Sequence, residues 1–235
     1  MSADMIITID GPAGAGKSTA ARGLAQRLGF DYLDTGAMYR IVAWACRDRG
    51  VDLSEADGVA TLARSLTLRF DGRSVLCDDR DVTAAIRTAE ASEGASIVAA
   101  IPTVRQEMVR LQREAAADRN VVSEGRDQGT VVFPDADCKF FVTADATERA
   151  VRRHAENVGK GHEIPLQEVL SQIIERDRRD RTRNISPLIE PEDALNIDTS
   201  SISPDDVLNL LEKVARQKLG PAVPATESTQ TDSRL

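Results

Sequence analysis

The sequence predicts an α/β fold in which helices flank a central parallel sheet of five strands. The first observation is a short apolar run, Met5–Asp10, that ends in a glycine-rich turn, as a buried parallel strand does. The second is the alternation that follows. Lys17–Leu28 has helical spacing, Phe30–Leu33 resembles a strand, and Ala37–Arg49 is helical again. Strand, helix and strand in this order require crossover connections, which place parallel strands side by side.

The middle of the chain has a different pattern. Leu66–Phe70 and Ser74–Cys77 flank the turn sequence Asp71-Gly72-Arg73, which is typical of a β-hairpin. Asp81-Val82 is a candidate for a third short strand. We therefore expect a small antiparallel insertion within the α/β chain.

The second half returns to the α/β pattern. Pro102 opens a helix whose apolar face we assign to four residues: Val104, Met108, Leu111 and Ala115. The remaining strands are predicted at Asn120–Ser123, Lys139–Val142 and Ala194–Asp198. The remaining helices are predicted from about Ala146, over Leu166–Arg183 and over Pro204–Leu219. Residues 220–235 have no periodicity and are interpreted as a disordered tail.

Composition and charge exclude several classes of function. Apolar residues make up 41% and charged residues 29% of the chain, as in ordinary globular proteins. No apolar run approaches the about 18–20 residues of a membrane span, and the N-terminus lacks the features of a signal peptide. The three cysteines lack metal-site or disulfide spacing. The net charge of −8 disfavours nucleic-acid binding. We expect a cytoplasmic protein with no membrane or nucleic-acid partner.

The segment from Gly11 to Ser18 carries the strongest functional signal. It reads Gly-Pro-Ala-Gly-Ala-Gly-Lys-Ser and matches the P-loop pattern G-x-x-x-x-G-K-[ST], between a predicted strand and a predicted helix. Backbone N–H groups of such a loop turn toward phosphate oxygens, and the helix N-terminus favours negative charge. Lys17 would reach the β- and γ-phosphates, and the Ser18 hydroxyl would ligate Mg²⁺. The pattern predicts nucleoside triphosphate binding.

Other motifs separate the classes of P-loop protein. A GTPase would carry Asn-Lys-x-Asp, which the sequence lacks. A motor would carry an apolar run ending in two acids, and the nearest candidate, Val121–Glu124, ends in only one. A kinase of a small substrate therefore fits best.

A run of arginines supports a kinase. Five arginines lie between Arg176 and Arg183, and the planar guanidinium suits bidentate contact with phosphate. On a helix, Arg176, Asp180 and Arg183 share one face, so Asp180 could hold both arginines. A solvated helix with many salt bridges is the alternative. Because a proline-containing loop, Ile185–Glu192, follows, we interpret the run as a lid that brings arginines over the transferring phosphoryl group.

Four segments together resemble the bacterial cytidylate kinases, a family of P-loop nucleoside monophosphate kinases. They are Ile9–Ser18, Leu33–Arg40, Glu124–Pro134 and Arg176–Arg183. The D-[ST]-G-A-x-Y-R and G-R-D-x-G-T-V-V-F-P patterns are specific to that family, and the similarity extends from about Met5 to Leu219. The family's loop often has Gly where this chain has Ser18, and the segment around Asn157–Glu163 matches less well.

The resemblance implies an ATP-dependent kinase that converts CMP or dCMP to CDP or dCDP, with Mg²⁺ as cofactor, acting as a monomer. It implies one nucleoside monophosphate kinase domain over residues 1–219. The core would be about 5–49, 120–150 and 194–219, the nucleotide-binding insertion about 50–119, and the lid about 155–192.

The resemblance also implies site residues by motif position. The ATP site would comprise Gly11, Pro12, Ala13, Gly14, Ala15, Gly16, Lys17, Ser18, Thr19, Arg152 and Arg153. The CMP site would comprise Thr35, Tyr39, Arg40, Ser96, Arg105, Arg126, Asp127, Arg176, Asp180 and Arg183.

Within these sets the resemblance implies distinct roles. Arg40, Arg126 and Arg183 would hold the acceptor phosphate. Ser96, Arg105 and Asp127 would contact the cytosine. Arg176 and Asp180 would lie near the sugar. The catalytic residues would be Lys17, Arg126, Arg176 and Arg183. The Mg²⁺ ligand would be Ser18, with Asp34 a candidate through water.

Two other functions remain open at this stage. A P-loop kinase acting on a hydroxyl group would need a carboxylate to accept its proton, and Asp34 or Asp127 could serve. A nucleotide-binding regulatory or RNA-associated protein is the non-enzymatic alternative. The sequence does not rank CMP, dCMP and UMP, and Tyr39, Arg105 and Asp127 each have an ordinary structural interpretation.

Overall fold

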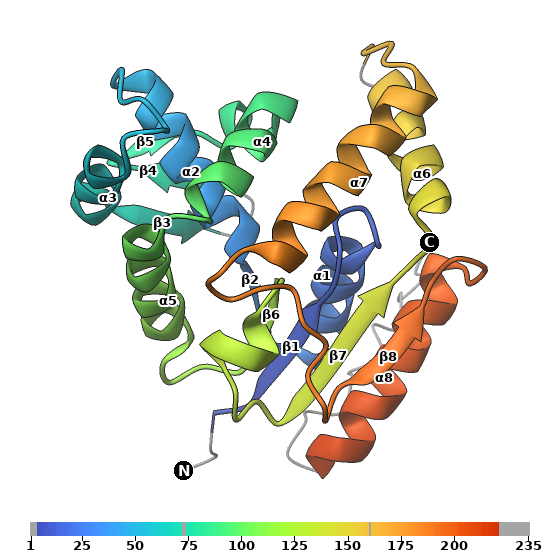
Figure 1. Ribbon diagram of the computed structural model, residues 1–235. Helices are drawn as coiled ribbons and strands as arrows, with labels where there is room; N and C mark the ends of the chain where they lie inside the picture. Colours follow the sequence, from blue (N-terminus) through green and yellow to red (C-terminus); the bar gives the residue numbers. More distant parts are fainter. Residues whose placement is uncertain (1–3, 72–73, 160, 221–235) are drawn as a thin grey trace, which may run out of the picture.

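The computed structural model describes residues 4–71, 74–159 and 161–220 (Figure 1). The predicted turn at Gly72-Arg73 and all of the predicted tail except Gly220 therefore lie outside the described residues. Among the described helices, none combines the length and the apolar character needed to cross a membrane.

A five-stranded parallel sheet forms the centre, as predicted. Its strand order is β2-β6-β1-β7-β8. The strands are β1 (Ile6–Asp10), β2 (Asp31–Asp34), β6 (Val121–Gly125), β7 (Cys138–Thr143) and β8 (Leu195–Asp198). Because β1 lies between β6 and β7, its side chains Ile7 and Ile9 are fully buried. The carboxyl end of β1 thus opens at the middle of one edge of the sheet.

Helices α1 (Lys17–Leu28) and α8 (Pro204–Leu219) pack together against the sheet. Their buried face is apolar and includes Leu24, Leu28 and Leu211. The bounds of both helices agree with the sequence prediction, because each has a clear start and stop. Gly29 adopts the left-handed conformation after α1, and Ser203 caps the N-terminus of α8.

The loop between β1 and α1 depends on a glycine at position 11. Gly11 has φ of 146°, and a Cβ there would lie 1.9 Å from the Val142 carbonyl oxygen of β7. No other residue fits such a close approach without a backbone shift. The glycine therefore lets the chain leave the sheet and turn back into α1.

The insertion forms a second, smaller body. After α2 (Thr35–Asp48) come α3 (Ala56–Ser65), the antiparallel strands β3 (Leu68–Asp71), β4 (Ser74–Cys77) and β5 (Arg80–Asp81), the turn Ala85–Arg87, α4 (Ala89–Val98) and α5 (Pro102–Ala116). The three-stranded antiparallel sheet was predicted, whereas α3 and α4 were not. Helices α2, α3, α4 and α5 share one apolar core, so the insertion has its own centre of packing.

The predicted apolar face of α5 was wrong at its C-terminal end. Ala115 is exposed, whereas Gln112 and Ala116 are buried. Arg105 also faces inward on this helix. Two polar side chains therefore take places that an apolar pattern would not reveal, and Arg105 reaches the site described below.

The last two helices before β8 form a hairpin. Helices α6 (Ala146–Gly159) and α7 (Leu166–Thr182) pack through a small apolar cluster of Ala150, Val169 and Ile173. In Figure 1 this hairpin and the insertion project on two sides of the carboxyl edge of the sheet. The short helical turn Gln128–Val132 follows β6 and packs against β1.

Two adjacent leucines on α8 provide a test of the apolar core that α1 and α8 form with the central sheet. Leu211 is fully buried and Leu210 is 37% exposed. We expect Leu211→Ala to lower the free energy of unfolding by about 2–5 kcal/mol, because it removes buried apolar surface and leaves a cavity. Leu210→Ala, the matched control, should change it by about 0.5 kcal/mol or less. Urea denaturation of both variants measures the difference, and equal losses would contradict the packing of α8.

Candidate functional site

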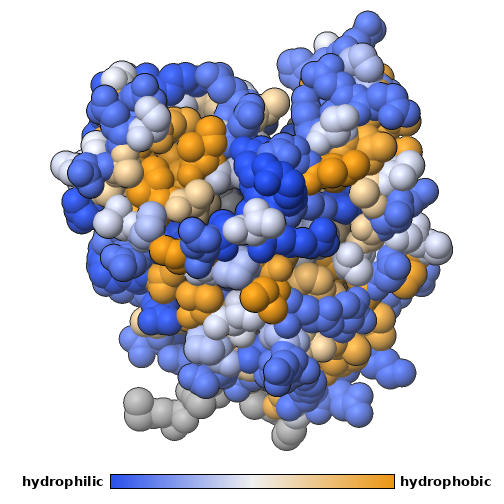
Figure 2. All heavy atoms as spheres, in the orientation of Figure 1, coloured by the Kyte–Doolittle hydropathy of each residue, from blue (hydrophilic) through white to orange (hydrophobic). Residues whose placement is uncertain are grey.

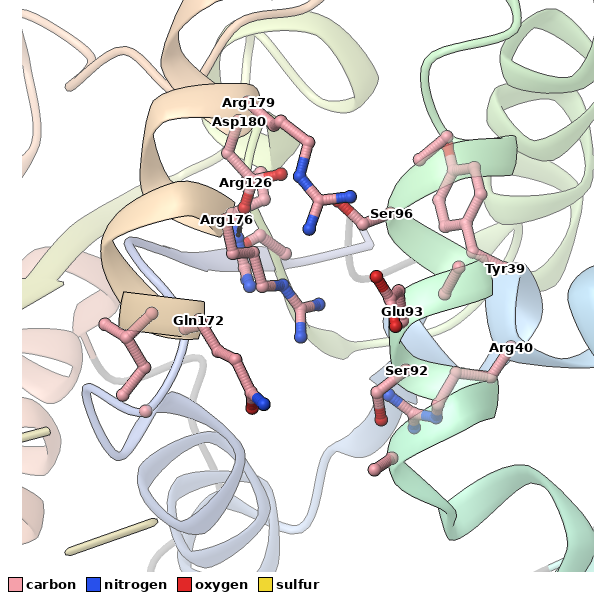
Figure 3. A pocket seen from close by; sticks show the side chains of 18 of the residues that line it. Tyr39, Arg40, Ser92, Glu93, Ser96, Arg126, Gln172, Arg176, Arg179 and Asp180 are labelled. Carbon is pink, nitrogen blue, oxygen red and sulfur yellow. Dashed lines mark hydrogen bonds and ion pairs between the residues drawn. The ribbon is translucent and has the colours of Figure 1, made fainter. Parts of the chain in front are cut away.

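A cavity of about 830 Å³ lies at the carboxyl edge of the sheet. Residues of the P-loop, α2 and α4 line it, as do residues of β6 and α7. Figure 2 shows hydrophilic residues gathered in the hollow between the two projecting parts. In Figure 3, Gln172, Arg176, Arg179 and Asp180 of α7 face Ser92, Glu93 and Ser96 across the cavity.

The P-loop end of the cavity is built from the start of α1. Gly16 precedes the helix in the left-handed conformation, and no side chain caps the helix. The first N–H groups of α1 therefore have no side-chain partner at the cap, which leaves them available to an anion. Lys17 is only 5% exposed, and its ammonium donates to the Pro12 carbonyl oxygen at 2.6 Å. Ser18 is exposed and lines the cavity beside it.

The electrostatic state of Lys17 is unusual. Burial and then the nearby positive charge of Arg126 lower the pKa of Lys17 to about 7. Glu124 and Asp10 act in the opposite direction. A buried lysine in this state gains its proton when an anion binds beside it.

The start of α2 forms one wall of the cavity. Asp34 caps this helix through its Oδ1, which accepts from the Ala37 N–H at 2.8 Å, and its Oδ2 pairs with Arg40 at 2.9 Å. The Thr35 hydroxyl donates to the Glu124 carbonyl oxygen at 2.6 Å. Both oxygens of Asp34 are therefore engaged, and Arg40 is held at the cavity wall.

A buried ion pair lies deeper, between α5 and the end of β6. Arg105 pairs with Asp127, and the two side chains are 3% and 4% exposed. The Arg105 guanidinium also lies 5.5 Å from the centre of the Tyr39 ring, a cation–π contact. Burial raises the pKa of Tyr39 to about 12. The Ser96 Oγ has no hydrogen-bond partner among the described residues. This end of the cavity holds a donor and an acceptor side by side.

The arginines of α7 enter the cavity from the other side. Arg126 Nε donates to Asp180 Oδ2 at 2.8 Å. Burial and then Arg126 lower the pKa of Arg176 to about 10. Arg183 Nε donates to the Ser186 carbonyl oxygen at 2.6 Å, while its Nη2 is buried without a partner among the described residues.

The predicted arrangement on α7 needs a correction. Asp180 forms its ion pair with Arg126, and no ion pair joins it to Arg176 or Arg183 among the described residues. For Arg183 the reason is that α7 ends at Thr182, after which the chain turns and the Arg183 Nε donates to the Ser186 carbonyl oxygen. Asp180 instead lies over the end of β6, where Arg126 stands.

Most of the predicted site residues line one cavity. They are Ala13, Gly14, Lys17, Ser18, Asp34, Thr35, Tyr39, Arg40, Ser96, Arg105, Arg126, Asp127, Arg153, Arg176, Asp180 and Arg183. The others do not line it: Gly11, Pro12, Ala15, Gly16, Thr19 and Arg152. Arg152 donates to the Thr199 carbonyl oxygen at 2.6 Å, so its predicted contact with ATP remains a prediction.

Sequence reasoning missed several polar residues of the site. Glu93 and Arg179 line the cavity, but α4 was not predicted and Arg179 was one arginine among five. Glu124 is buried and accepts a hydrogen bond from the Tyr32 hydroxyl at 2.5 Å. Asp10 accepts from the Gln128 and Gly129 N–H groups at 2.9 and 2.7 Å, and burial raises its pKa to about 6. The sequence analysis considered Glu124 only as the acid that ends Val121–Glu124 and as the start of the Glu124–Pro134 motif, and Asp10 only as the end of the first predicted strand.

The residues present fit a Mg²⁺ ion that arrives with phosphates. The described residues hold no cluster of three or more His, Cys, Asp or Glu side chains that could bind a metal by itself. Mg²⁺ commonly binds through one or two protein groups together with substrate phosphates and water. The exposed Ser18 hydroxyl supplies such a group, whereas Asp34 is already engaged.

Comparison with known proteins gives a consistent result. The family model described as Cytidylate kinase matches residues 7–217. A cytidylate kinase of Carboxydothermus hydrogenoformans is 46% identical over 218 residues, covering 91% of this chain and 98% of the relative. One of Shewanella sp. (strain MR-7) is 44% identical over 220 residues, covering 91% and 96%. An uncharacterized protein from Eubacterium ventriosum has a TM-score of 0.53 at 12% identity, covering 90% of this chain and 98% of its own. That likeness concerns the fold alone.

The lowered pKa of Lys17 predicts proton uptake when a triphosphate binds. Above pH 7 the empty site holds Lys17 largely neutral, and an adjacent triphosphate restores the ammonium. We expect ATP binding at pH 8 to take up a fraction of a proton that is absent at pH 6. Calorimetry in buffers of different ionisation enthalpy measures this uptake. In Lys17→Arg, whose charge does not titrate in this range, the uptake should disappear. Unchanged uptake in that variant would assign the proton to another group.

Proposed function

The chain belongs to the cytidylate kinase family and transfers the γ-phosphoryl group of ATP to CMP or dCMP, and from this premise we propose which residues perform the transfer. The observation that carries the proposal is the single cavity that joins the P-loop to the Arg105–Asp127 pair, with arginines between them. A triphosphate at one end and a pyrimidine at the other would bring their phosphates together in the middle.

At the donor end, we assign the triphosphate to the P-loop. The open N–H groups of α1 and the Lys17 ammonium would contact the β- and γ-phosphates. Mg²⁺ would enter with ATP, with the Ser18 hydroxyl as its protein ligand, and would neutralise charge between the β- and γ-phosphates. Arg153 lines the cavity on the α6 side and is assigned to the same phosphates. Thr35, which also lines the cavity, is assigned to the CMP site and not to ATP.

At the acceptor end, we assign the phosphate of CMP to Arg40, Arg126 and Arg183. Three observations support this: all three line the cavity, Arg40 is fixed by Asp34, and Arg126 is fixed by Asp180. Arg176 carries no ion pair among the described residues, although it is half-buried in the cavity wall and its Nε has no hydrogen-bond partner there. We assign Arg176 to the phosphoryl group in transfer, where negative charge has to be stabilised.

The transfer needs no general base. The acceptor is a phosphate monoester with a second pKa of about 6, so at neutral pH it is mostly a dianion and already nucleophilic. The task of the protein is to hold two anions in line, and Lys17, Mg²⁺ and the arginines accomplish this by position and charge. A hydroxyl-directed kinase would need a free carboxylate in this place, and the two candidates, Asp34 and Asp127, are both paired with arginines.

The buried ion pair is our candidate for base recognition. Cytosine presents an amino donor beside the N3 acceptor. The Asp127 carboxylate would accept from the amino group and Arg105 would donate to N3, with the unpartnered Ser96 hydroxyl as a further contact. Uracil presents a carbonyl and an N–H at these positions, so it would place an acceptor against the Asp127 carboxylate and a donor against the Arg105 guanidinium.

The proposed roles of the insertion and of the lid also rest on the lining of this cavity. We propose that residues 50–119 bind the acceptor nucleotide and that residues 155–192 act as a lid, because each contributes one wall. A closing lid would exclude water from the phosphates. The monomeric state and the cytoplasmic location remain predictions.

Two substitutions test base recognition against phosphate binding. We expect wild-type protein to prefer CMP over UMP by roughly 10- to 10³-fold in kcat/KM. Asp127→Ala should reduce this ratio toward one, because it removes the acceptor that only cytosine satisfies. Arg183→Ala, the control, removes a contact common to both nucleotides and should weaken both about equally. Steady-state kinetics with both acceptors give the ratio.

Asp127→Asn guards against loss of folding, since it keeps the shape of the side chain while the amide pairs less well with Arg105. A CMP/UMP ratio that stays at the wild-type value in both Asp127 variants would remove Asp127 from base recognition. A wild-type preference for AMP would overturn the assignment of the acceptor pocket as a whole.

A further inference from the structure

Arg149 of α6 makes three separate polar contacts beneath the site. Its Nε donates to the Ala144 carbonyl oxygen at 2.9 Å, and its Nη1 donates to the Ala13 carbonyl oxygen of the P-loop at 3.0 Å. Its Nη2 lies 2.7 Å from Asp177 Oδ2 on α7. One guanidinium therefore joins the P-loop, the segment between β7 and α6, and the C-terminal half of α7. Neither Arg149 nor Asp177 lines the cavity.

The contacts of Arg149 and Asp177 are enclosed by protein. Their side chains are 4% and 6% exposed. Gly14 of the P-loop lies directly against Arg149, because a Cβ at position 14 would be 3.4 Å from Arg149 Cβ. The α6–α7 hairpin already has an apolar contact in Ala150, Val169 and Ile173. Adhesion between the two helices thus does not require a buried ion pair, which is costly to desolvate.

The position of Asp177 fixes how α7 is turned about its own axis. At 3.6 residues per turn, Arg176 and Asp180 project within about 40° of one another, and Asp177 projects about 60–100° away from them. An Asp177 held toward α6 and the P-loop therefore keeps Arg176 and Asp180 directed into the cavity, as Figure 3 shows. Asp180 in turn holds Arg126.

We propose that Arg149 and Asp177 are positioning residues that couple the P-loop to the acceptor-side arginines of α7. When a triphosphate orders the P-loop, the Ala13 carbonyl oxygen fixes Arg149, and Arg149 fixes the rotation of α7 through Asp177. Arg176 and the Asp180–Arg126 pair then stand ready for the second nucleotide. The proposal rests on the proposed binding of ATP phosphates to the P-loop.

The measurement is the effect of one nucleotide on the affinity of the other. Calorimetry gives the Kd of CMP alone and with a saturating non-hydrolysable ATP analogue and Mg²⁺. In wild type we expect the analogue to tighten CMP binding by about 5-fold or more, the lower end of usual coupling between sites. In Asp177→Asn the factor should fall below about 2-fold, while the Kd of CMP alone changes little.

Two further variants separate positioning from general stability. Arg149→Lys keeps the positive charge but not the fork that reaches three acceptors, so it should also lose the coupling, and it serves if Asp177→Asn does not fold. Asp193→Asn is the matched control and breaks the ion pair between Lys139 and Asp193, whose charged atoms are 2.9 Å apart. Neither residue lines the cavity. This variant should keep the wild-type ratio between the Kd of CMP without and with the ATP analogue. Circular dichroism verifies the fold of each variant.

The outcomes distinguish this proposal from the proposed function. Wild-type coupling retained in Asp177→Asn or Arg149→Lys would overturn the positioning role. Wild-type protein that binds both nucleotides without any coupling would overturn it as well. If wild-type protein failed to bind CMP or the ATP analogue, the assignment of the nucleotide sites themselves would fall.

Discussion

The site depends on basic side chains gathered in a partly buried cavity, where only some of them are paired with carboxylates. Arg40, Arg105 and Arg126 each have a carboxylate partner there. Lys17 and Arg176 have none at ion-pair distance among the described residues, and both have pKa values lowered by burial and by Arg126. Such an arrangement is unfavourable while the cavity is empty. The phosphates of the two substrates would offset the repulsion between these basic side chains, so the charges of the site are balanced only when both substrates are bound.

The fold brings these charges together because parallel strands end at one edge. Gly11 allows the chain to turn at the end of β1, and Lys17 begins α1 directly above it. Arg126 and Asp127 follow β6, the neighbour of β1. The insertion and the α6–α7 hairpin then provide the two walls. Residues far apart in sequence thus meet at one place, where a low local dielectric strengthens each contact with a phosphate.

The sequence predicted those features that depend on local pattern. The five parallel strands, the P-loop, the bounds of α1 and α8 and the antiparallel hairpin all have strong local signals. Helix α4 lacked one, because its alanine-, serine- and glycine-rich sequence has little amphipathic contrast. The apolar pattern of α5 did not indicate that Arg105 and Gln112 face inward, since polar residues on a helix ordinarily face water. Only the family resemblance placed Arg105 at the site.

Ion pairs and hydrogen bonds between side chains on distant elements could not be predicted from local sequence patterns. The family resemblance pointed to Asp180, but its partner depends on how α7 crosses the end of β6. Arg149 was not singled out, although it lies within three residues of the predicted Arg152, because only the packing of α6 on the P-loop gives it three acceptors. The sequence identifies charged residues well, whereas their partners are a property of tertiary structure.

We infer that substrate phosphates order the arginine-rich wall of the cavity. Hydrogen exchange of residues 176–192 tests it in four states: empty protein, ATP analogue alone, CMP alone, and both together. We expect the strongest protection with both nucleotides, and little protection when cytidine, which lacks the phosphate, replaces CMP. Equal exchange in all four states, or full protection by cytidine, would contradict it.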